Sequence, residues 1–254
     1  MVGIKQHMKK YTVINMSGAY KRLAGFISEL NKREDVVWID CESLSGTECY
    51  CDSDSADRIR GILSCNGIDY HGVHFIDNGN YHYLSKLLTD SIDEPFNLFV
   101  ADNHPDTQSP LFGPILSCGS WVKDLIEENK NVNKVYLSGV NPQLITHEVT
   151  GMDKVVVLDS GADIMDVIPD DIPLYISIDK DVLDIDECVT NWDQGNMSFN
   201  ALTDIIIKLI SYRQVLGIDI CGEMDSMMYD KADNIRIHKN DTINIELLNA
   251  LDSF

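Results

Sequence analysis

The sequence has few basic residues: 20 Lys and Arg stand against 41 Asp and Glu, which gives a formal net charge of −21 over 254 residues. A surface of that sign repels nucleic-acid phosphates and anionic lipids, so we expect neither as a partner. The same charge is compatible with metal cations and cationic substrates, although net charge alone identifies neither.

Long apolar runs and paired cysteine motifs are also missing. No apolar stretch approaches the ~20 residues that span a membrane, and the start of the chain, "MVGIKQHMKKYTVINM", lacks the apolar core of a secretion signal. The seven cysteines include one C-x-C pair, at 49 and 51, without a second pair at zinc-ribbon spacing. We therefore expect a cytoplasmic protein with reduced thiols and no membrane partner.

What is present is an alternation of strand-type and helix-type segments, with a hydrophobic content of 44% that is normal for a globular protein. Predicted strands cover 11–16, 35–40, 72–77, 96–101, 134–139, 154–159, 173–179 and 215–220. Predicted helices include 19–32, 55–66, 198–212 and 242–254. Several strand runs are apolar without alternation, which is typical of a parallel sheet covered on both faces. We predict one domain over 1–254, an α/β fold of three layers (α/β/α) with a mostly parallel sheet of about eight strands.

Ligand-type side chains follow one of these strands, in "NLFVADNHPDTQ". Asp102, His104 and Asp106 occupy alternate positions, which face the same side of an extended chain. In open α/β sheets, ligands bind beyond the carboxyl ends of the strands. A dinucleotide is not the expected ligand, because no G-x-G-x-x-G follows the first strand and no P-loop is present.

A second acidic cluster lies in "LYISIDKDVLDID", where Asp179 and Asp181 follow a strand and Asp184 and Asp186 come later. A calcium-binding loop is excluded, because the sixth position from Asp179 is not glycine and the twelfth is Thr190 instead of Glu.

A third strand end carries His82, in "FIDNGNYHYLS". Taken singly, each of these residues has an ordinary explanation: an Asp at a strand end caps a helix or begins a turn, and a lone His is a structural or surface residue. Together, the three strand ends would gather four carboxylates, whose repulsion would raise their pKa values or open the site. Two divalent cations would neutralise that charge, so we predict a binuclear metal site.

The three motifs together resemble those of the ureohydrolase family, which includes arginase, agmatinase and formimidoylglutamase. "GNYHY" is similar to the family's G-G-D-H-S motif, "ADNHPDTQ" to D-A-H-x-D, and "SIDKDVLDID" to S-x-D-x-D-x-x-D-P, over roughly 70–225. The resemblance implies the arginase/deacetylase-like version of the predicted fold.

The resemblance also implies how the ligands are shared. One metal would be held by His82, Asp102, Asp106 and Asp179. The other would be held by Asp102, His104, Asp179 and Asp181, with Asp102 and Asp179 bridging. Oxygen-rich ligation with one imidazole per metal suits Mn²⁺, the family's usual metal, without excluding Ni²⁺, Fe²⁺ or Zn²⁺.

The predicted reaction is hydrolysis of a linear C–N bond in a small cationic guanidino or amidino compound. Two cations that share a water lower its pKa from ~15.7 towards neutrality, and the resulting hydroxide attacks a planar carbon. Asp106 would accept a hydrogen bond from that hydroxide and orient it.

The sequence departs from the family at two candidate catalytic residues, Cys118 and Glu223. In arginases a His-Gly pair downstream of the second motif transfers protons; "LSCGSWV" has Cys118 there, either as a proton shuttle or as a cysteine packed behind the site. The family's substrate-pairing Glu comes three residues after an Asp, but in "GIDICGEMD" Gly222 has that position and Glu223 follows. Glu223 would either reach the substrate through a bulge or be an ordinary loop carboxylate.

Other departures concern the loops. "NWDQGNMS" replaces a loop that lines the family's site, so Trp192 and Asp193 are candidate substrate contacts, with an exposed turn as the alternative. The motif proline is replaced by Ile185 or Asp186, and the arginine-tail recognition residues are not evident beside the second motif. Family members commonly form trimers or hexamers, so a homo-oligomer is compatible with the resemblance.

The sequence leaves two alternative functions open. A deacetylase-like amide hydrolase would use a single zinc and a His-His pair, which the sequence lacks. A catalytically silent metal-binding protein is favoured by the missing His and the shifted Glu, and is opposed by the complete ligand set.

Overall fold

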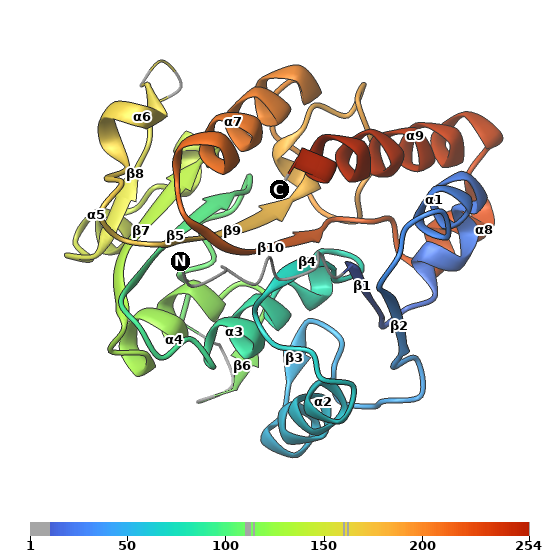
Figure 1. Cartoon of the computed structure of the whole chain (residues 1–254), viewed down its shortest axis with the longest axis horizontal. Helices are drawn as coiled ribbons and strands as arrows, with labels where there is room; N and C mark the ends of the chain where they lie inside the picture. The colour runs from blue at the N-terminus through green and yellow to red at the C-terminus, as the bar shows by residue number, and fades with distance from the viewer. Residues whose placement is uncertain (1–10, 110–112, 114, 160, 162, 254) are drawn as a thin grey trace, which may run out of the picture.

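Eight strands form the central sheet of the computed structural model, which describes residues 11–109, 113, 115–159, 161 and 163–253 (Figure 1). They are β1 (Tyr11–Asn15), β2 (Val36–Asp40), β4 (Gly72–Phe75), β5 (Phe96–Ala101), β7 (Val132–Ser138), β8 (Val155–Val157), β9 (Leu174–Asp179) and β10 (Val215–Cys221). The order is β2-β1-β4-β10-β9-β5-β7-β8, and every neighbouring pair is parallel. All eight predicted strands are present, with ends shifted by at most two residues.

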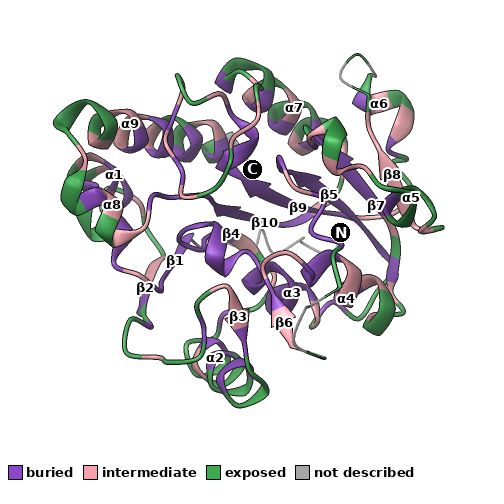
Figure 2. Ribbon diagram, turned by 180° about the vertical axis from the view of Figure 1, so that it is seen from behind, coloured by how far each residue is buried: buried purple, intermediate pink, exposed green. Residues whose placement is uncertain are grey.

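Helices cover both faces of this sheet, which confirms the predicted three-layer α/β/α fold (Figures 1 and 2). One face packs against α1 (Ala24–Leu30), α7 (Phe199–Tyr212) and α9 (Asn234–Ala250). The other packs against α2 (Ser53–Cys65), α3 (Leu84–Thr89) and α4 (Trp121–Glu128). Shorter helices are α5 (His147–Thr150), α6 (Ile164–Val167) and α8 (Ser226–Lys231), with 3₁₀ helices η1 (Ala19–Arg22), η2 (Gly79–Tyr81), η3 (Pro142–Leu144), η4 (Lys180–Val182) and η5 (Leu251–Ser253).

The helices on both faces of the sheet explain why the strand sequences do not alternate between apolar and polar residues. Along β5, Leu98 and Val100 face one hydrophobic core, whereas Phe99 and Ala101 face the other. Every residue of β5 and β9 is buried, so side chains on both faces of these strands are mostly apolar, with Asn97 and Ser177 as buried polar exceptions.

Helix boundaries follow local hydrogen bonds that periodicity alone did not predict. The segment predicted as one helix over 19–32 is divided at Leu23, which has φ −105° and ψ 80°. The last helix begins at residue 234 instead of 242, because the side chain of Asp233 accepts a hydrogen bond from the Arg236 amide at 2.9 Å. The predicted end of that helix, residue 254, lies outside the described residues.

A second, two-stranded sheet was not predicted. It pairs β3 (Tyr50–Cys51) with β6 (Leu116–Ser117) in antiparallel orientation. The Cys118 amide donates to the Cys49 carbonyl at 2.9 Å, so the pairing brings these two cysteines together. Two-residue strands leave no periodic signal in a sequence. Among the described residues, no helix has the length and apolar character needed to span a membrane.

Candidate metal centre

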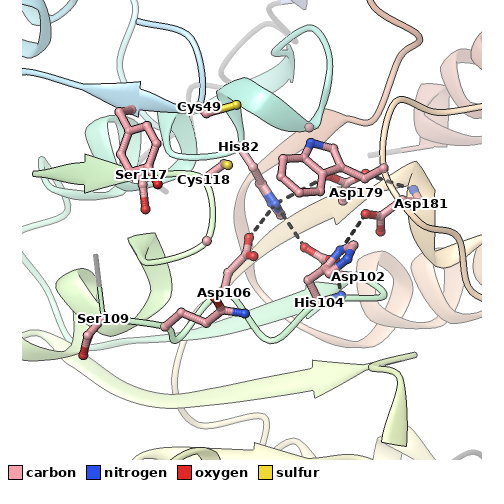
Figure 3. Close-up of a pocket in the computed structure, with 15 residues that line it drawn as sticks. Cys49, His82, Asp102, His104, Asp106, Ser109, Ser117, Cys118, Asp179 and Asp181 are labelled. Atoms are coloured by element: carbon pink, nitrogen blue, oxygen red, sulfur yellow. Dashed lines mark hydrogen bonds and ion pairs between the residues drawn. The ribbon is translucent and has the colours of Figure 1, made fainter. Parts of the chain in front are cut away.

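A pocket of about 260 Å³ opens where β5 and β9 end (Figure 3). All six predicted ligands line it: His82, Asp102, His104, Asp106, Asp179 and Asp181. Because β5 and β9 are paired in register, with Ala101 opposite Ile178, the next residues Asp102 and Asp179 reach the same edge of the sheet.

The side chains after β5 converge through a loop and not through an extended chain, which corrects the predicted geometry. The backbone bends at 103 and 104 because the Asp102 carboxylate accepts a hydrogen bond from the His104 amide at 2.6 Å. Asp106 has φ +49°, and its Oδ2 accepts from Trp121 Nε1 at 2.6 Å. The start of α4 therefore holds Asp106, the third predicted ligand after β5, in place.

The first donor cluster surrounds His82 at the end of η2. Its Nδ1 lies 3.0 Å from Asp106 Oδ2, 3.1 Å from Asp102 Oδ2 and 3.7 Å from Asp179 Oδ2. Nε2 lies 2.9 Å from Ser177 Oγ. A proton on Nε2, donated to Ser177, leaves the lone pair on Nδ1. Although His82 is only 1% exposed, Nδ1 has no hydrogen-bond partner among the described residues.

The second cluster surrounds His104. Its Nδ1 lies 2.8 Å from Asp181 Oδ2 and 3.4 Å from Asp102 Oδ1. Asp102 thus turns one oxygen to each imidazole, and the two clusters share it.

The carboxylates of the site are buried without a counter-charge from Lys or Arg in the described part of the chain. Burial raises the pKa of Asp102 and of Asp179, and burial with the charge of Asp102 raises the pKa of Asp181 to about 7. Burial alone would lower the pKa of His104, but its bonds to Asp102 and Asp181 raise that pKa to about 11. Four acidic groups and two imidazoles, gathered without a basic side chain among their ion-pair partners, fit divalent cations well.

Trp192 forms one wall of the pocket, as predicted, whereas Asp193 does not line it. The Trp192 indole Nε1 donates to Asn80 Oδ1 at 3.0 Å, and its ring lies 5.8 Å from the His104 ring, edge to face. Asp193 is exposed, and its backbone carbonyl accepts a hydrogen bond from Asn103.

Glu223 was predicted to contact substrate, but it is not one of the described residues that line the pocket. It is fully buried beneath the site, where Oε1 accepts from Lys180 and Asn244. Its Oε2 accepts from Tyr229 at 2.7 Å and from Asn240 at 3.3 Å. Residues of the chain thus occupy both carboxylate oxygens. The structure is closer to the second alternative, in which Glu223 does not contact substrate, although Glu223 forms a buried ion pair and does not lie in an exposed loop.

Cys118 lines the pocket beside a second thiol, Cys49, that was not predicted (Figure 3). A hydrogen bond from the Cys118 thiol lowers the pKa of Cys49, and the same bond together with burial raises the pKa of Cys118. Cys118 therefore keeps its proton, and Cys49 is the thiol that exchanges one more readily.

Three supporting residues also escaped the sequence analysis: Trp121, Ser177 and Cys221. Cys221 pairs with Asp179 in the β9–β10 register, and its thiol donates to Asp179 Oδ2 at 3.1 Å. Only the strand register places it at the site, because 42 residues separate it from Asp179.

No protein-family model matches the chain. An uncharacterized protein of Thermotoga maritima is 33% identical over 184 residues, which are 71% of this chain and 68% of the relative. Proclavaminate amidino hydrolase of Streptomyces clavuligerus has a similar structure, with a TM-score of 0.69 at 15% identity over 96% of this chain and 92% of that chain. Formimidoylglutamase of Bacillus subtilis gives 0.66 at 15% identity over 100% of this chain and 89% of that chain.

These similarities confirm the fold that the three motifs predicted, at a level of identity expected of a divergent sequence. The chain has the ureohydrolase fold and belongs to the same protein family as the Thermotoga maritima protein.

Proposed function

We propose that the protein is a metal-dependent hydrolase that cleaves a linear C–N bond of a small guanidino or amidino compound. The proposal rests above all on the two donor clusters that share Asp102 at the floor of one pocket. The surroundings of His82 Nδ1 support a cation there, because this buried nitrogen lies within 3.7 Å of three carboxylate oxygens and makes no hydrogen bond in the described residues.

Two divalent cations fit the site, and Mn²⁺ is the first candidate. One would be held by His82, Asp102, Asp106 and Asp179, and the other by Asp102, His104, Asp179 and Asp181. Bound there, the cations would supply a water of lowered pKa and neutralise the carboxylates.

The residues of the chain would position the reaction. Ser177 holds the His82 ring through Nε2, and Trp121 donates to Asp106, which would orient the attacking water. Trp192 presents an aromatic wall, which suits a planar cation. Of the two pocket thiols, Cys49 is better suited than Cys118 to exchange a proton with the departing amine.

The first experiment is metal analysis of the purified protein before and after reconstitution with Mn²⁺. We expect close to two metals per chain, lost in Asp179→Ala and retained in Asp186→Ala, a matched change at an exposed carboxylate of the same motif. A screen for urea or ammonia release over guanidino and amidino compounds then tests the reaction. One tightly held zinc would indicate a deacetylase-like amide hydrolase instead, and no bound metal in any condition would exclude both enzymes.

A metal-binding protein without catalysis is the second candidate. The occupied oxygens of Glu223 favour it, because they leave no carboxylate at that position for a cationic substrate. Two bound metals without turnover of any compound in the screen would support this candidate.

A further inference from the structure

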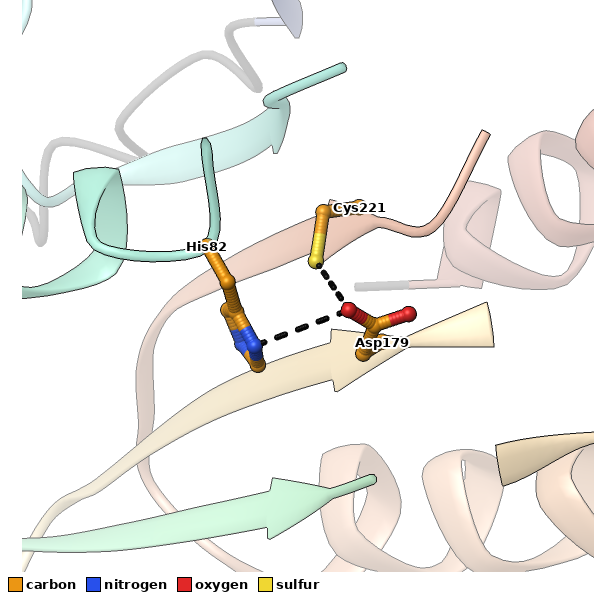
Figure 4. A group of neighbouring side chains, drawn as sticks. All are labelled: His82, Asp179 and Cys221. Atoms are coloured by element: carbon orange, nitrogen blue, oxygen red, sulfur yellow. Dashed lines mark hydrogen bonds and ion pairs between the residues drawn. The ribbon is translucent and has the colours of Figure 1, made fainter. Parts of the chain in front are cut away.

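Cys221 is the last residue of β10 and lies beside Asp179, the last residue of β9 (Figure 4). Both side chains point to the same side of the sheet, and Cys221 Sγ is 3.1 Å from Asp179 Oδ2. His82 Nδ1 approaches the same oxygen at 3.7 Å. One donor atom from each residue lies within 4.8 Å of the other two.

We propose that Cys221 is a thiolate ligand of the metal that His82 holds. This position would then have sulfur, nitrogen and oxygen donors, whereas the His104 position would have only nitrogen and oxygen. The inference rests on the proposed function, since it needs a cation at His82.

The hydrogen bonds of the three residues favour a cation over an ordinary buried thiol. The Cys221 proton satisfies Asp179 Oδ2, whereas His82 Nδ1 lies 3.0, 3.1 and 3.7 Å from three carboxylate oxygens and makes no hydrogen bond in the described structure. A cation in place of that proton would contact sulfur, nitrogen and oxygen together, and the displaced proton would leave to solvent. All three residues are buried, so a thiolate formed there would be shielded from oxidants.

The backbone after Cys221 explains why a side chain of β10 reaches the site. Gly222 has φ +90°, and a Cβ there would lie 2.4 Å from Asp179 Oδ1 and 2.6 Å from the Lys180 amide nitrogen. The two strand ends can approach this closely only because residue 222 has no side chain. The approach leaves Cys221 as the neighbour of the carboxylate.

A sulfur ligand changes the expected metal preference. Thiolates favour Zn²⁺, Fe²⁺ or Co²⁺ over Mn²⁺, which prefers oxygen donors. The two positions of the centre would therefore differ, with the softer ion beside His82 and the harder ion beside His104.

Cobalt substitution tests the proposal without an activity assay. In the Co²⁺-loaded protein we expect a near-ultraviolet thiolate-to-cobalt charge-transfer band. Cys221→Ser should abolish the band and weaken binding of one cobalt at least about tenfold. The matched control is Cys49→Ser/Cys118→Ser, which removes the other pocket thiols and should keep the band. Circular dichroism checks folding, and Cys221→Ala repeats the test with a smaller side chain.

The outcomes separate this inference from the proposed function. Two bound cobalt ions without the band would overturn the sulfur ligand and leave the binuclear site intact. Loss of the band in the control variant instead of Cys221→Ser would overturn it by assigning the band to the other thiols. No bound cobalt in any variant would reject the metal centre and the ligand together.

Discussion

Asp179, Lys180 and Asp181 are consecutive residues whose side chains enter two regions of opposite character. Asp179 and Asp181 face the pocket at the end of the sheet, whereas Lys180 extends beneath it towards α9. Both regions are buried and contain charged groups. They differ in whether the chain itself supplies the opposite charge.

Beneath the pocket, Lys180 and Glu223 match each other's charge. Lys180 pairs with Glu223 and donates to Asn244 at 3.1 Å, while Tyr229 and Asn240 occupy the other oxygen of Glu223. In the pocket, four buried carboxyl groups have only imidazoles as ion-pair partners among the described residues. The chain neutralises the buried Lys180–Glu223 pair itself, whereas the clustered carboxyl groups of the pocket are consistent with the proposed external cations.

The largest effect on stability should come from removing one partner of the buried Lys180–Glu223 ion pair. Lys180→Met leaves Glu223 buried and unpaired, which should lower the free energy of unfolding by about 3–5 kcal/mol in urea titrations. Lys21→Met is the matched control: Lys21 pairs with Asp40 and Glu42 on the surface, and its loss should change stability much less than the loss of Lys180. Equal effects of the two changes would contradict the comparison.

Removal of a pocket carboxylate should change the free energy of unfolding in the opposite direction. Asp179→Asn removes a buried carboxyl whose pKa is raised by burial and by Asp181, so in the presence of a chelator at neutral pH the free energy of unfolding should rise. Added Mn²⁺ should stabilise the unmodified protein but not this variant. A loss of stability in the chelator would show that the carboxylate supports the fold.

The smallest effect should be seen in thiol reactivity at pH 8. On the matched side, burial raises the pKa of Cys188 to about 12, so Cys188 stays protonated far above neutral pH and should resist iodoacetamide. On the pocket side, the hydrogen bond from Cys118 lowers the pKa of Cys49, which should be labelled faster. Peptide mass spectrometry gives both rates, with exposed Cys65 as the positive control. Equal labelling rates for Cys49 and Cys188 would contradict the expected difference between the pKa values of the two thiols.

The sequence predicted the sheet and the residues that line the pocket because both leave local signals. Strands buried on two faces are largely apolar runs; Asp102 follows β5 directly, and Asp179 is the last residue of β9. The role of Glu223 could not be predicted, since it depends on Lys180, 43 residues away, and Asn244, 21 residues away. The thiol pair depends on two strands of two residues each, and Cys221 depends on a strand register. Partners distant in sequence were missed, while residues adjacent to strands were found.

The glycine at 222 also limits how this protein can change. Ureohydrolases carry a substrate-pairing glutamate three residues after the aspartate that corresponds to Asp219, and here that position is Gly222. Restoring the glutamate by a single substitution would drive its Cβ into Asp179 and require φ +90° of a residue with a side chain. Directed evolution towards an arginine-type substrate would therefore have to begin with an insertion or deletion that rebuilds the end of β10. A point mutation at 222 would displace Asp179, a proposed metal ligand, before it could create a specificity contact.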